Sequence, residues 1–405
     1  MKGYIMGNIY EELGVRTIIN ATGPSTRLSG SIMSDEVSSA MKAASEHCVD
    51  IAELQAWAGG VIAEITGAEA GYVTSGAAAG LLLGVSACVT GLDPGRMNRL
   101  PDLTGMKDEV IMPRSHRNFY DHAIRAVGVK LIEVGIADRF SGAGVRDTEA
   151  WEIDDAITDR TAAIAYVVNA HSQPLLPEVV EVAHAKGVPV VVDAAGQLPP
   201  QSNLKRFIVE GADIVCFSGG KTIRGPQSSG ILCGKWELVS AAALQHLDQD
   251  IYAELWDPPP SLIDKETLPG APQHGLGRPC KVGKEEIVGL ITALRMFVEE
   301  GDQARAERWA NSIRSLGAAL EGLPNITVDM QINPGRPVPM LRLTLDEEKS
   351  GITGVNLAKQ LIKGDPCIQP GTGGMYEGEI TFGPMCLRDG DVEAIGKRLS
   401  EILGG

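Results

Sequence analysis

The sequence predicts an α/β protein whose large, mostly parallel sheet is covered by helices on both faces. Between about residues 50 and 235, short runs rich in Val and Ile alternate with helical stretches. Such continuous apolar runs are typical of parallel strands that are buried on both faces. A chain of 405 residues with 44% hydrophobic and 22% charged residues also has enough apolar material for a sizeable core.

The strands predicted for this sheet are separated by turns and helices. They are expected at residues 70–75, 108–114, 130–135, 162–169, 189–195, 212–218 and 230–234. Helices are expected at 76–90, in "NFYDHAIRAVG" after the second strand, and at 177–187. Gly187 is a suitable C-terminal cap for the last of these helices.

The pattern changes after residue 235. The segment 257–279 is rich in Pro and Gly and is longer than most loops that only connect two elements, which favours a binding or interface role. Two long helices are expected at 284–301 and 302–323, followed by a small α+β domain. Its strands are expected near 326–332, 339–345 and 378–383, and its helices near 354–364 and 391–403.

These patterns suggest three parts of the chain. We expect an N-terminal segment at 1–50, a large α/β domain at 51–285, and a linker helix with a small C-terminal domain at 286–405.

Composition limits the classes of partner. The formal net charge is −16 and the basic residues are scattered, which argues against nucleic acid or an anionic membrane as a partner. Seven cysteines without CxxC or paired spacing favour a reducing compartment and indicate no metal site. The N-terminus is too polar for a signal peptide, and no apolar run could span a bilayer. We therefore expect a cytoplasmic protein.

The stretch "CFSGGKTIRGPQSSG" places Lys221 between glycines directly after an apolar run. A P-loop would need a glycine at position 215, where the sequence has Val215, and Pro226 would interrupt the helix that should follow. A solvated surface lysine is the plain alternative. A lysine near a dry pocket loses its proton readily, however, and can then react with a carbonyl cofactor.

Three further segments help to decide whether Lys221 is a surface lysine or binds a cofactor. Asp193 ends the run "VVVD", where a carboxylate could keep the nitrogen of a pyridine ring protonated, although it could also cap a turn. Ser75, Gly76 and Ala77 lie at a strand–helix junction whose backbone amides suit a phosphate group.

The third segment is "PRSHRNFYDH". In it, His116 could stack on a cofactor ring, with His122 as an alternative and a structural histidine as the plain explanation.

The order of these features resembles fold-type I pyridoxal-phosphate enzymes, that is, the PLP-dependent transferase fold. Ser218, three residues before the lysine, matches a common phosphate ligand of that superfamily. The segments "INATGPSTRLSG", "VTSGAAAG", "VVDAAGQLPP", "FSGGKTIRGPQSSGILCG" and "GLGRPCKVGKEE" together resemble the bacterial selenocysteine synthase family. Within it, the chain is most similar to the branch of D-glucosaminate-6-phosphate ammonia-lyases, over roughly residues 10–300.

The resemblance implies a pyridoxal 5′-phosphate enzyme in which Lys221 holds the cofactor and then removes the α-proton of an amino acid substrate. Asp193 would help to hold the resulting negative charge. Loss of a β-hydroxyl and release of ammonia would turn an amino sugar acid, such as D-glucosaminate 6-phosphate, into a 2-keto-3-deoxy acid.

The resemblance also suggests arginines for the substrate's carboxylate or phosphate: Arg27, Arg224, Arg278 and Arg388. For each, a surface arginine is the plain alternative. Arg278 and Lys281 could reach the site of a neighbouring subunit in a homodimer or higher homo-oligomer with shared active sites.

Other functions stay open at this point. The same cofactor could support racemisation, aldol cleavage or a transfer reaction, and a non-catalytic interaction protein is the third possibility. A tRNA substrate is disfavoured because the chain has no segment rich in Lys and Arg.

Overall fold

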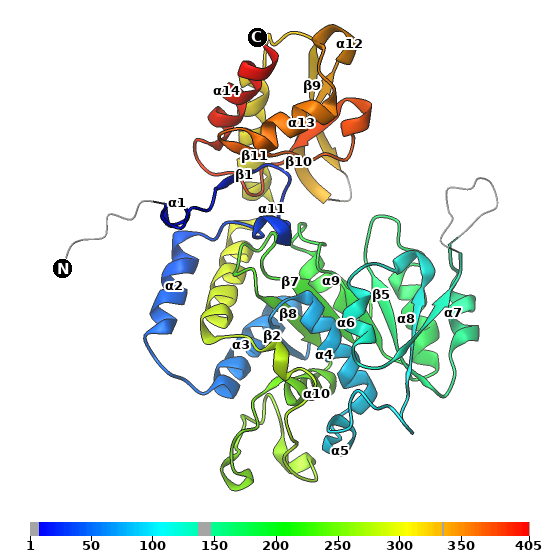
Figure 1. The fold of residues 1–405 in the computed structure, drawn as a ribbon. Helices are drawn as coiled ribbons and strands as arrows, with labels where there is room; N and C mark the ends of the chain where they lie inside the picture. The colour runs from blue at the N-terminus through cyan, green and yellow to red at the C-terminus, as the bar shows by residue number, and fades with distance from the viewer. Residues whose placement is uncertain (1–7, 137–146, 334–335, 405) are drawn as a thin grey trace. The chain divides into compact units, whose positions relative to one another are not determined.

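The structure, a computed structural model, describes residues 8–136, 147–333 and 336–404 (Figure 1). The first seven residues of the expected N-terminal segment lie outside this range. The chain forms two units: Met33–Glu299 is the larger, and Met1–Ile32 together with Glu300–Gly405 is the smaller. Thus residues 33–50 fold with the large sheet, whereas the chain before them belongs with the C-terminal part.

The larger unit is built on a seven-stranded sheet of order β2-β8-β7-β6-β5-β3-β4 in the described chain. The strands are β2 (Ala70–Thr74), β3 (Glu109–Pro113), β4 (Lys130–Val134), β5 (Thr161–Val167), β6 (Val190–Asp193), β7 (Ile214–Ser218) and β8 (Gly230–Gly234). Strand β8 is antiparallel to β2 and β7, and every other pair is parallel. The predicted α/β class with a mostly parallel sheet is confirmed.

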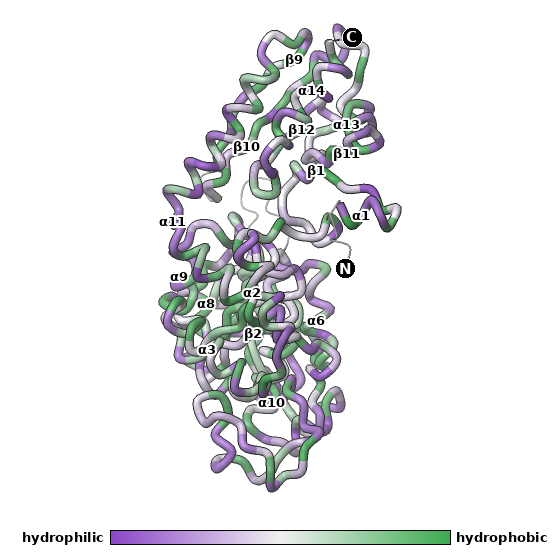
Figure 2. Tube along the Cα trace, turned by 90° about the vertical axis from the view of Figure 1, so that its left-hand side faces the viewer, coloured by the Kyte–Doolittle hydropathy of each residue, from purple (hydrophilic) through white to green (hydrophobic). Residues whose placement is uncertain are grey.

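Helices cover both faces of this sheet because neighbouring strand residues point to opposite sides. On β6, Val191 packs with one face, and Val190 and Val192 pack with the other. The first face carries α4 (Ala77–Thr90), α5 (Pro94–Met97), α6 (Asp121–Arg125) and α10 (Trp236–His246). The second carries α2 (Asp35–Ser45), α3 (Ile51–Thr66), α7 (Ala150–Ala156), α8 (Leu176–Ala185), α9 (Asn203–Val209) and the first part of α11 (Lys284–Ala319). Figure 2 shows apolar chain concentrated in the interior of this unit.

Two glycines allow α4 to lie close to the sheet. A Cβ atom at Gly80 would lie 2.9 Å from the Sγ of Cys216, and one at Gly84 would lie 3.3 Å from Ile214. Because both spacings are tighter than ordinary contact, larger side chains would push the helix off β7. The start of α4 is thereby fixed at the carboxyl end of the parallel strands.

The smaller unit has its own core and sheet. Strands β9 (Ile326–Asn333), β10 (Arg336–Leu345) and β12 (Glu379–Phe382) form an antiparallel sheet of order β12-β10-β9. Its helices are α1 (Ile9–Glu12), the second part of α11, α12 (Glu347–Ser350), α13 (Gly354–Lys363) and α14 (Asp391–Leu403). A short parallel pair, β1 (Ile18–Asn20) with β11 (Cys367–Gln369), ties the N-terminal segment to this unit. The sequence patterns did not predict this pair.

The two long helices expected after residue 284 are present as the two parts of α11, which meet at a kink at Gly301. There the backbone has φ 71° and ψ 165°, a conformation that glycine adopts without steric strain. The preceding segment 257–279 contains one short 3₁₀ turn, Lys265–Thr267, and another, Arg278–Cys280, begins within it. None of the described helices is long and apolar enough to cross a membrane.

Neighbouring glycines in α3 give a direct test of this packing. A Cβ atom at Gly59 would lie 2.3 Å from the carbonyl oxygen of Gly71 on β2, whereas one at Gly60 would meet nothing within 4 Å. Both alanine variants gain the same helix propensity, so the difference between their free energies of unfolding isolates the steric effect. We expect Gly60→Ala to stabilise the protein by up to about 1 kcal/mol and Gly59→Ala to destabilise it by about 1–3 kcal/mol. Urea unfolding midpoints measure both, and equal midpoints would contradict the α3–β2 contact.

Candidate active site

Predicted site residues gather at the carboxyl ends of the parallel strands. Val167 on β5 pairs with Asp193 on β6, which in turn pairs with Cys216 on β7. Ser218 is the last residue of β7, and Lys221 follows in the next turn. In open α/β sheets, ligands bind beyond this edge. The structure therefore places Asp193, Ser218 and Lys221 on adjacent strand ends.

Asp193 is a carboxylate in a largely apolar setting. Burial, the largest influence, raises its pKa above the ordinary value, and this outweighs the opposing effects of the Ala195 amide and the Lys221 ammonium. The Ala195 amide donates to Oδ1 at 3.0 Å. A further positive charge nearby would therefore stabilise the ionised form of Asp193. Asp193 ends a buried strand, and its bond to the amide two residues on also makes it the cap of the following turn.

Lys221 lies in a tightly folded turn. The amide of Arg224 donates to the Lys221 carbonyl at 3.0 Å, and the amide of Gly225 donates to the Gly219 carbonyl at 2.9 Å. The lysine is partly buried, and its Nζ lies 3.9 Å from where a Cβ of Gly196 would be. This puts the amine above the loop that follows Asp193.

The glycines beside Lys221 have a structural explanation. A Cβ atom at Gly219 would lie 2.2 Å from the Oγ of Ser229, and one at Gly220 would lie 2.6 Å from the Cα of Gln227. They let the turn pack against residues 226–229 of the same chain. Arg224 has φ 62°, an uncommon value for a residue other than glycine, and the same compact turn imposes it.

The start of α4 provides backbone amides for an anion. Gly76 is the N-cap residue, with φ 138°, and Ala77 begins the helix. A Cβ at Gly230 would lie 2.5 Å from the Gly76 carbonyl carbon, so β8 supports this junction closely. The hydroxyl of Ser75 donates to the Cys280 carbonyl at 2.8 Å. Ser75, Gly76 and Ala77 thus lie together at a helix start that suits a phosphate.

His116 is buried and held in a defined orientation. The amide of Val167 donates to its Nδ1 at 3.2 Å, and its ring meets Tyr166 edge-on, with centroids 4.7 Å apart. Since Val167 pairs with Asp193, the imidazole lies beside the strand end that carries the carboxylate. His122, the alternative, is exposed on α6.

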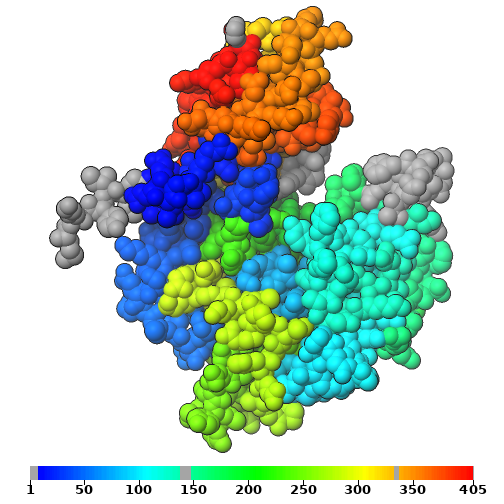
Figure 3. Space-filling view, in the orientation of Figure 1, coloured from blue at the N-terminus to red at the C-terminus, as the bar shows by residue number. Residues whose placement is uncertain are grey.

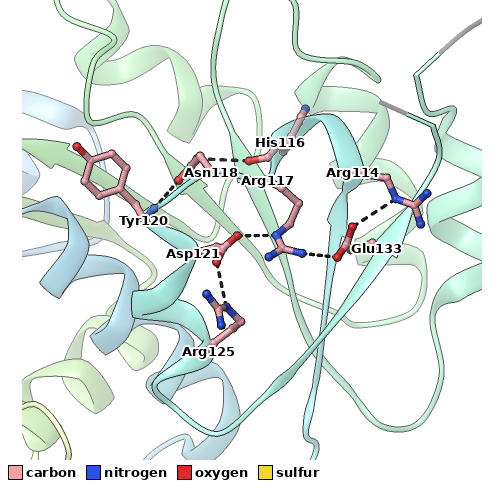
Figure 4. Close-up of polar contacts among 8 residues, drawn as sticks. All are labelled: Arg114, His116, Arg117, Asn118, Tyr120, Asp121, Arg125 and Glu133. Atoms are coloured by element: carbon pink, nitrogen blue, oxygen red, sulfur yellow. Dashed lines mark hydrogen bonds and ion pairs between the residues drawn. The ribbon is translucent and has the colours of Figure 1, made fainter. Parts of the chain in front are cut away.

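A network of charged residues holds the segment that carries His116 (Figure 4). Asp121, 3% exposed, accepts from the Nε atoms of Arg117, at 2.5 Å, and Arg125, at 3.0 Å. Burial alone would raise the pKa of Asp121, but the two arginines outweigh it and leave the pKa lowered. Arg117 also pairs with Glu133, which Arg114 approaches at 3.3 Å.

The same segment contributes to a small pocket beside Asp193. In the side chain of Asn118, Nδ2 donates to the His116 carbonyl at 3.3 Å, and Oδ1 accepts from the backbone amide of Tyr120 at 2.8 Å. The pocket is lined by Leu81, Met112, Asn118, Tyr120, Asp121, Ile124, Ala165, Tyr166, Val167, Val191 and Asp193. Sequence reasoning missed Asn118, Tyr120 and Asp121. The spacing Arg117–Asp121–Arg125, with opposite charges every four residues, is a signal that could have found the network, although only Asp121 and Arg125 lie on α6.

The predicted substrate arginines are distributed over both units. In the larger unit, Nε and Nη2 of Arg278 donate to Asp248 at 2.9 and 2.5 Å. Arg224, also in this unit, lies close enough to Glu36 to contribute to the lowered pKa of that carboxyl. Backbone and side-chain hydrogen bonds lower the pKa of Glu36 more than Arg224 does.

Arg27 and Arg388 belong to the smaller unit. Arg27 donates to Gln369 at 3.4 Å, and Arg388, 58% exposed, lies 3.7 Å from Asp391. The four predicted arginines thus divide two and two between the units. Lys281, in the larger unit, is exposed. Among the described residues, no group of three or more His, Cys, Asp or Glu side chains is arranged to hold a metal ion.

Comparison with known proteins gives a consistent set of relatives. A family model described as "SelA: L-seryl-tRNA selenium transferase" matches residues 18–251. A 5′-C-glycyluridine monooxygenase-decarboxylase from Streptomyces sp is 32% identical over 97% of this chain and 92% of that protein. A D-glucosaminate-6-phosphate ammonia lyase from Salmonella typhimurium (strain 14028s / SGSC 2262) is 29% identical over 98% of both chains.

Solved structures agree with this. A D-glucosaminate-6-phosphate ammonia-lyase structure matches with a TM-score of 0.82 at 28% identity, covering 99% of both chains. A structure of SPT with PLP matches with a TM-score of 0.53 at 11% identity, over 95% of this chain and 86% of that one, a likeness that shows the fold alone. The predicted PLP-dependent transferase fold is confirmed.

The raised pKa of Asp193 predicts a specific pH dependence of stability. Because the folded pKa exceeds the unfolded one, the folded state holds this proton more tightly, and the carboxyl destabilises the fold increasingly as pH rises. Without cofactor, Asp193→Asn should therefore gain stability relative to the parent between about pH 4 and pH 7. Urea unfolding across this range measures the gain. Asp159→Asn, at an exposed turn, is the control, and a gain that stays constant or shrinks with pH would contradict the assignment.

Proposed function

Because the chain belongs to the SelA family of L-seryl-tRNA selenium transferases and is an enzyme of this fold, we propose that it is a pyridoxal-5′-phosphate-dependent lyase acting on an amino sugar acid. The product would be a 2-keto-3-deoxy acid, released with ammonia. The observation that carries the proposal is a partly buried strand-end carboxylate, Asp193, near enough to the amine of Lys221, which follows the next strand, for the ammonium to lower its pKa.

The residues present fit this cofactor. The amides at the start of α4, with the hydroxyls of Ser75 and Ser218, suit its phosphate. Asp193, whose charged form lacks a full partner, suits a protonated ring nitrogen. His116, with its ring fixed by the Val167 amide and by Tyr166, lies at the same edge but is 2% exposed, so stacking on the ring would require its covering side chains to move. When bound, pyridoxal phosphate withdraws electrons from the bonds at the α-carbon of an amino acid.

The chain's own residues would then bind, orient and move protons. Asp193 keeps a positive charge on the ring nitrogen, because two opposite charges in a poorly solvated site stabilise each other. Lys221 would take the α-proton on Nζ, and the compact turn fixes the backbone from which that amine extends. The β-hydroxyl leaves as water, and water then replaces the amino group, so the net change is the loss of ammonia.

The substrate class rests on the relatives and on the arginines. The names of both relatives join an amino acid unit to a sugar: an amino sugar acid phosphate in one, and a glycyl unit on a nucleoside in the other. Arg278 and Arg224 are the candidates in the larger unit for a carboxylate or phosphate, and Arg27 and Arg388 are those in the smaller unit. A homodimer or higher homo-oligomer with shared active sites belongs to the same proposal.

One relative favours a second candidate function. The 32% identical protein is named as a monooxygenase-decarboxylase. By analogy, this chain would use molecular oxygen to decarboxylate a nucleoside-linked amino acid with the same lysine and carboxylate. Oxygen consumption separates this reaction from ammonia elimination alone.

The lyase proposal is tested with D-glucosaminate 6-phosphate and the purified, cofactor-loaded protein. We expect ammonia and a 2-oxo acid in equal amounts, and we expect Lys221→Ala to lower the rate at least about 100-fold because it removes the proton acceptor. Lys205→Ala, an exposed lysine on α9, is the matched control and should keep the parent rate.

Three results would speak against the proposal. Absence of both products would remove the substrate assignment. Oxygen-dependent release of carbon dioxide from a glycyl-nucleoside would replace it with the second function. An undiminished rate in Lys221→Ala would remove the role of the lysine.

A further inference from the structure

The segment 275–280, "GLGRPC", is bound to the end of α10 by the sequence "QHLD" at 245–248. The Gly277 amide donates to the Gln245 carbonyl at 3.0 Å, and the Leu276 amide donates to the Gln245 side chain at 3.1 Å. Arg278 pairs with Asp248, as described above. Figure 3 shows the chain between α10 and α11, in yellow-green, on the surface of the larger unit.

His246 makes the remaining contact of this set, at the carbonyl of Cys280. That oxygen lies 2.9 Å from Nε2 of His246 and 2.8 Å from Oγ of Ser75. A carbonyl oxygen has two lone pairs and only accepts hydrogen bonds, so the two donors occupy both of its positions. The carbonyl is thus a junction between the end of α10, the 275–280 segment and the start of α4.

Tyr72 fixes the tautomer of His246. Since Nε2 must carry the hydrogen donated to the carbonyl, Nδ1 of the neutral ring is an acceptor, and the hydroxyl of Tyr72 donates to it at 2.8 Å. Tyr72 is fully buried and His246 is 4% exposed. Burial lowers the pKa of His246, which keeps the imidazole neutral near pH 7. The donors therefore run in one direction, from Tyr72 through His246 to Cys280.

The hydroxyl of Ser75 has a single proton, which here goes to the Cys280 carbonyl. A phosphate at the start of α4 competes for that proton, because its oxygens accept hydrogen bonds. When the hydroxyl turns to the phosphate, His246 is the one donor that remains to the Cys280 carbonyl among the residues that the structure describes.

We propose that His246, oriented by Tyr72, is a positioning residue that keeps the Arg278-bearing segment in place when Ser75 binds the cofactor phosphate. This inference rests on the proposed function for the location of the phosphate. His246 touches neither cofactor nor substrate. Its role is to retain Cys280, and through it the neighbouring Arg278, next to the cofactor site.

Amide hydrogen exchange of residues 275–283, followed with and without pyridoxal phosphate, tests the proposal. In the parent, exchange should change less than about twofold on loading. In His246→Asn, where the shorter side chain cannot reach the Cys280 carbonyl, exchange should be near the parent's without cofactor and about five- to tenfold faster with it, as expected for one lost hydrogen bond. His246→Gln, whose amide nitrogen can take the place of Nε2, should restore the parent pattern.

A double-mutant cycle tests the same junction without cofactor. Ser75→Ala and His246→Asn each leave one donor on the carbonyl, so each alone should keep near-parent exchange, whereas the double variant should exchange about five- to tenfold faster. Ser240→Ala is the matched control, because it removes a buried hydrogen bond from α10 to Leu262 and leaves Cys280 untouched.

The outcomes distinguish failure of this inference from failure of the proposed function. If the parent binds pyridoxal phosphate, seen by absorbance, but His246→Asn exchanges like the parent with and without it, the inference is wrong and the proposed function stands. Fast exchange in cofactor-free His246→Asn with no further change on loading would also overturn it, since His246 would then be a general structural residue. If the parent binds no pyridoxal phosphate, the proposed function fails and the inference with it.

Discussion

The site depends on one constraint: a carboxylate must be kept in a poorly solvated place at the end of β6. Burial raises the pKa of Asp193, and the Ala195 amide and the Lys221 ammonium lower it by less. A partly buried acid whose pKa is raised destabilises a fold at neutral pH. A ligand with a positive charge would relieve this cost, and for this reason we propose Asp193 as the centre of the site.

The architecture supplies the neighbours of Asp193 through register and close packing. Parallel pairing sets Val167, Asp193 and Cys216 side by side, so the segments that follow these strands meet at one edge. His116 reaches the edge from β3 by its hydrogen bond to Val167, and the charged network around Asp121 holds its segment. The start of α4 is supported there by Gly80 and Gly230. Groups far apart in sequence thus become one site.

Sequence reasoning could predict the sheet and the centre of the site, and the reason is local. Continuous apolar runs mark buried parallel strands, and a polar residue directly after such a run lies at the carboxyl edge, which gave Asp193 and Lys221. The site roles of these residues stay predictions. The glycines beside Lys221 were noted correctly as sites of close approach, but what approaches them is the chain itself, at Ser229 and Gln227.

Other features could not be predicted because their signals are short or distant. β1 and β11 have three residues each, too few to show a period, yet their pairing places the N-terminal segment in the smaller unit. Tyr72, His246 and Cys280 meet across separations of 174 and 34 residues, and each looks like an ordinary core or loop residue in its own segment. Only the folded chain shows that they converge on Ser75.

The most direct test of the central claim is to locate the attachment of pyridoxal phosphate. The protein is loaded with it and reduced with borohydride, which makes a linkage between a lysine amine and the cofactor carbonyl permanent, and its peptides are then analysed by mass spectrometry. The account predicts one modified peptide, with the added mass on Lys221. No modified peptide, or modification at another lysine with Lys221 unmodified, would contradict the pairing of Lys221 with Asp193 on which the proposed chemistry rests.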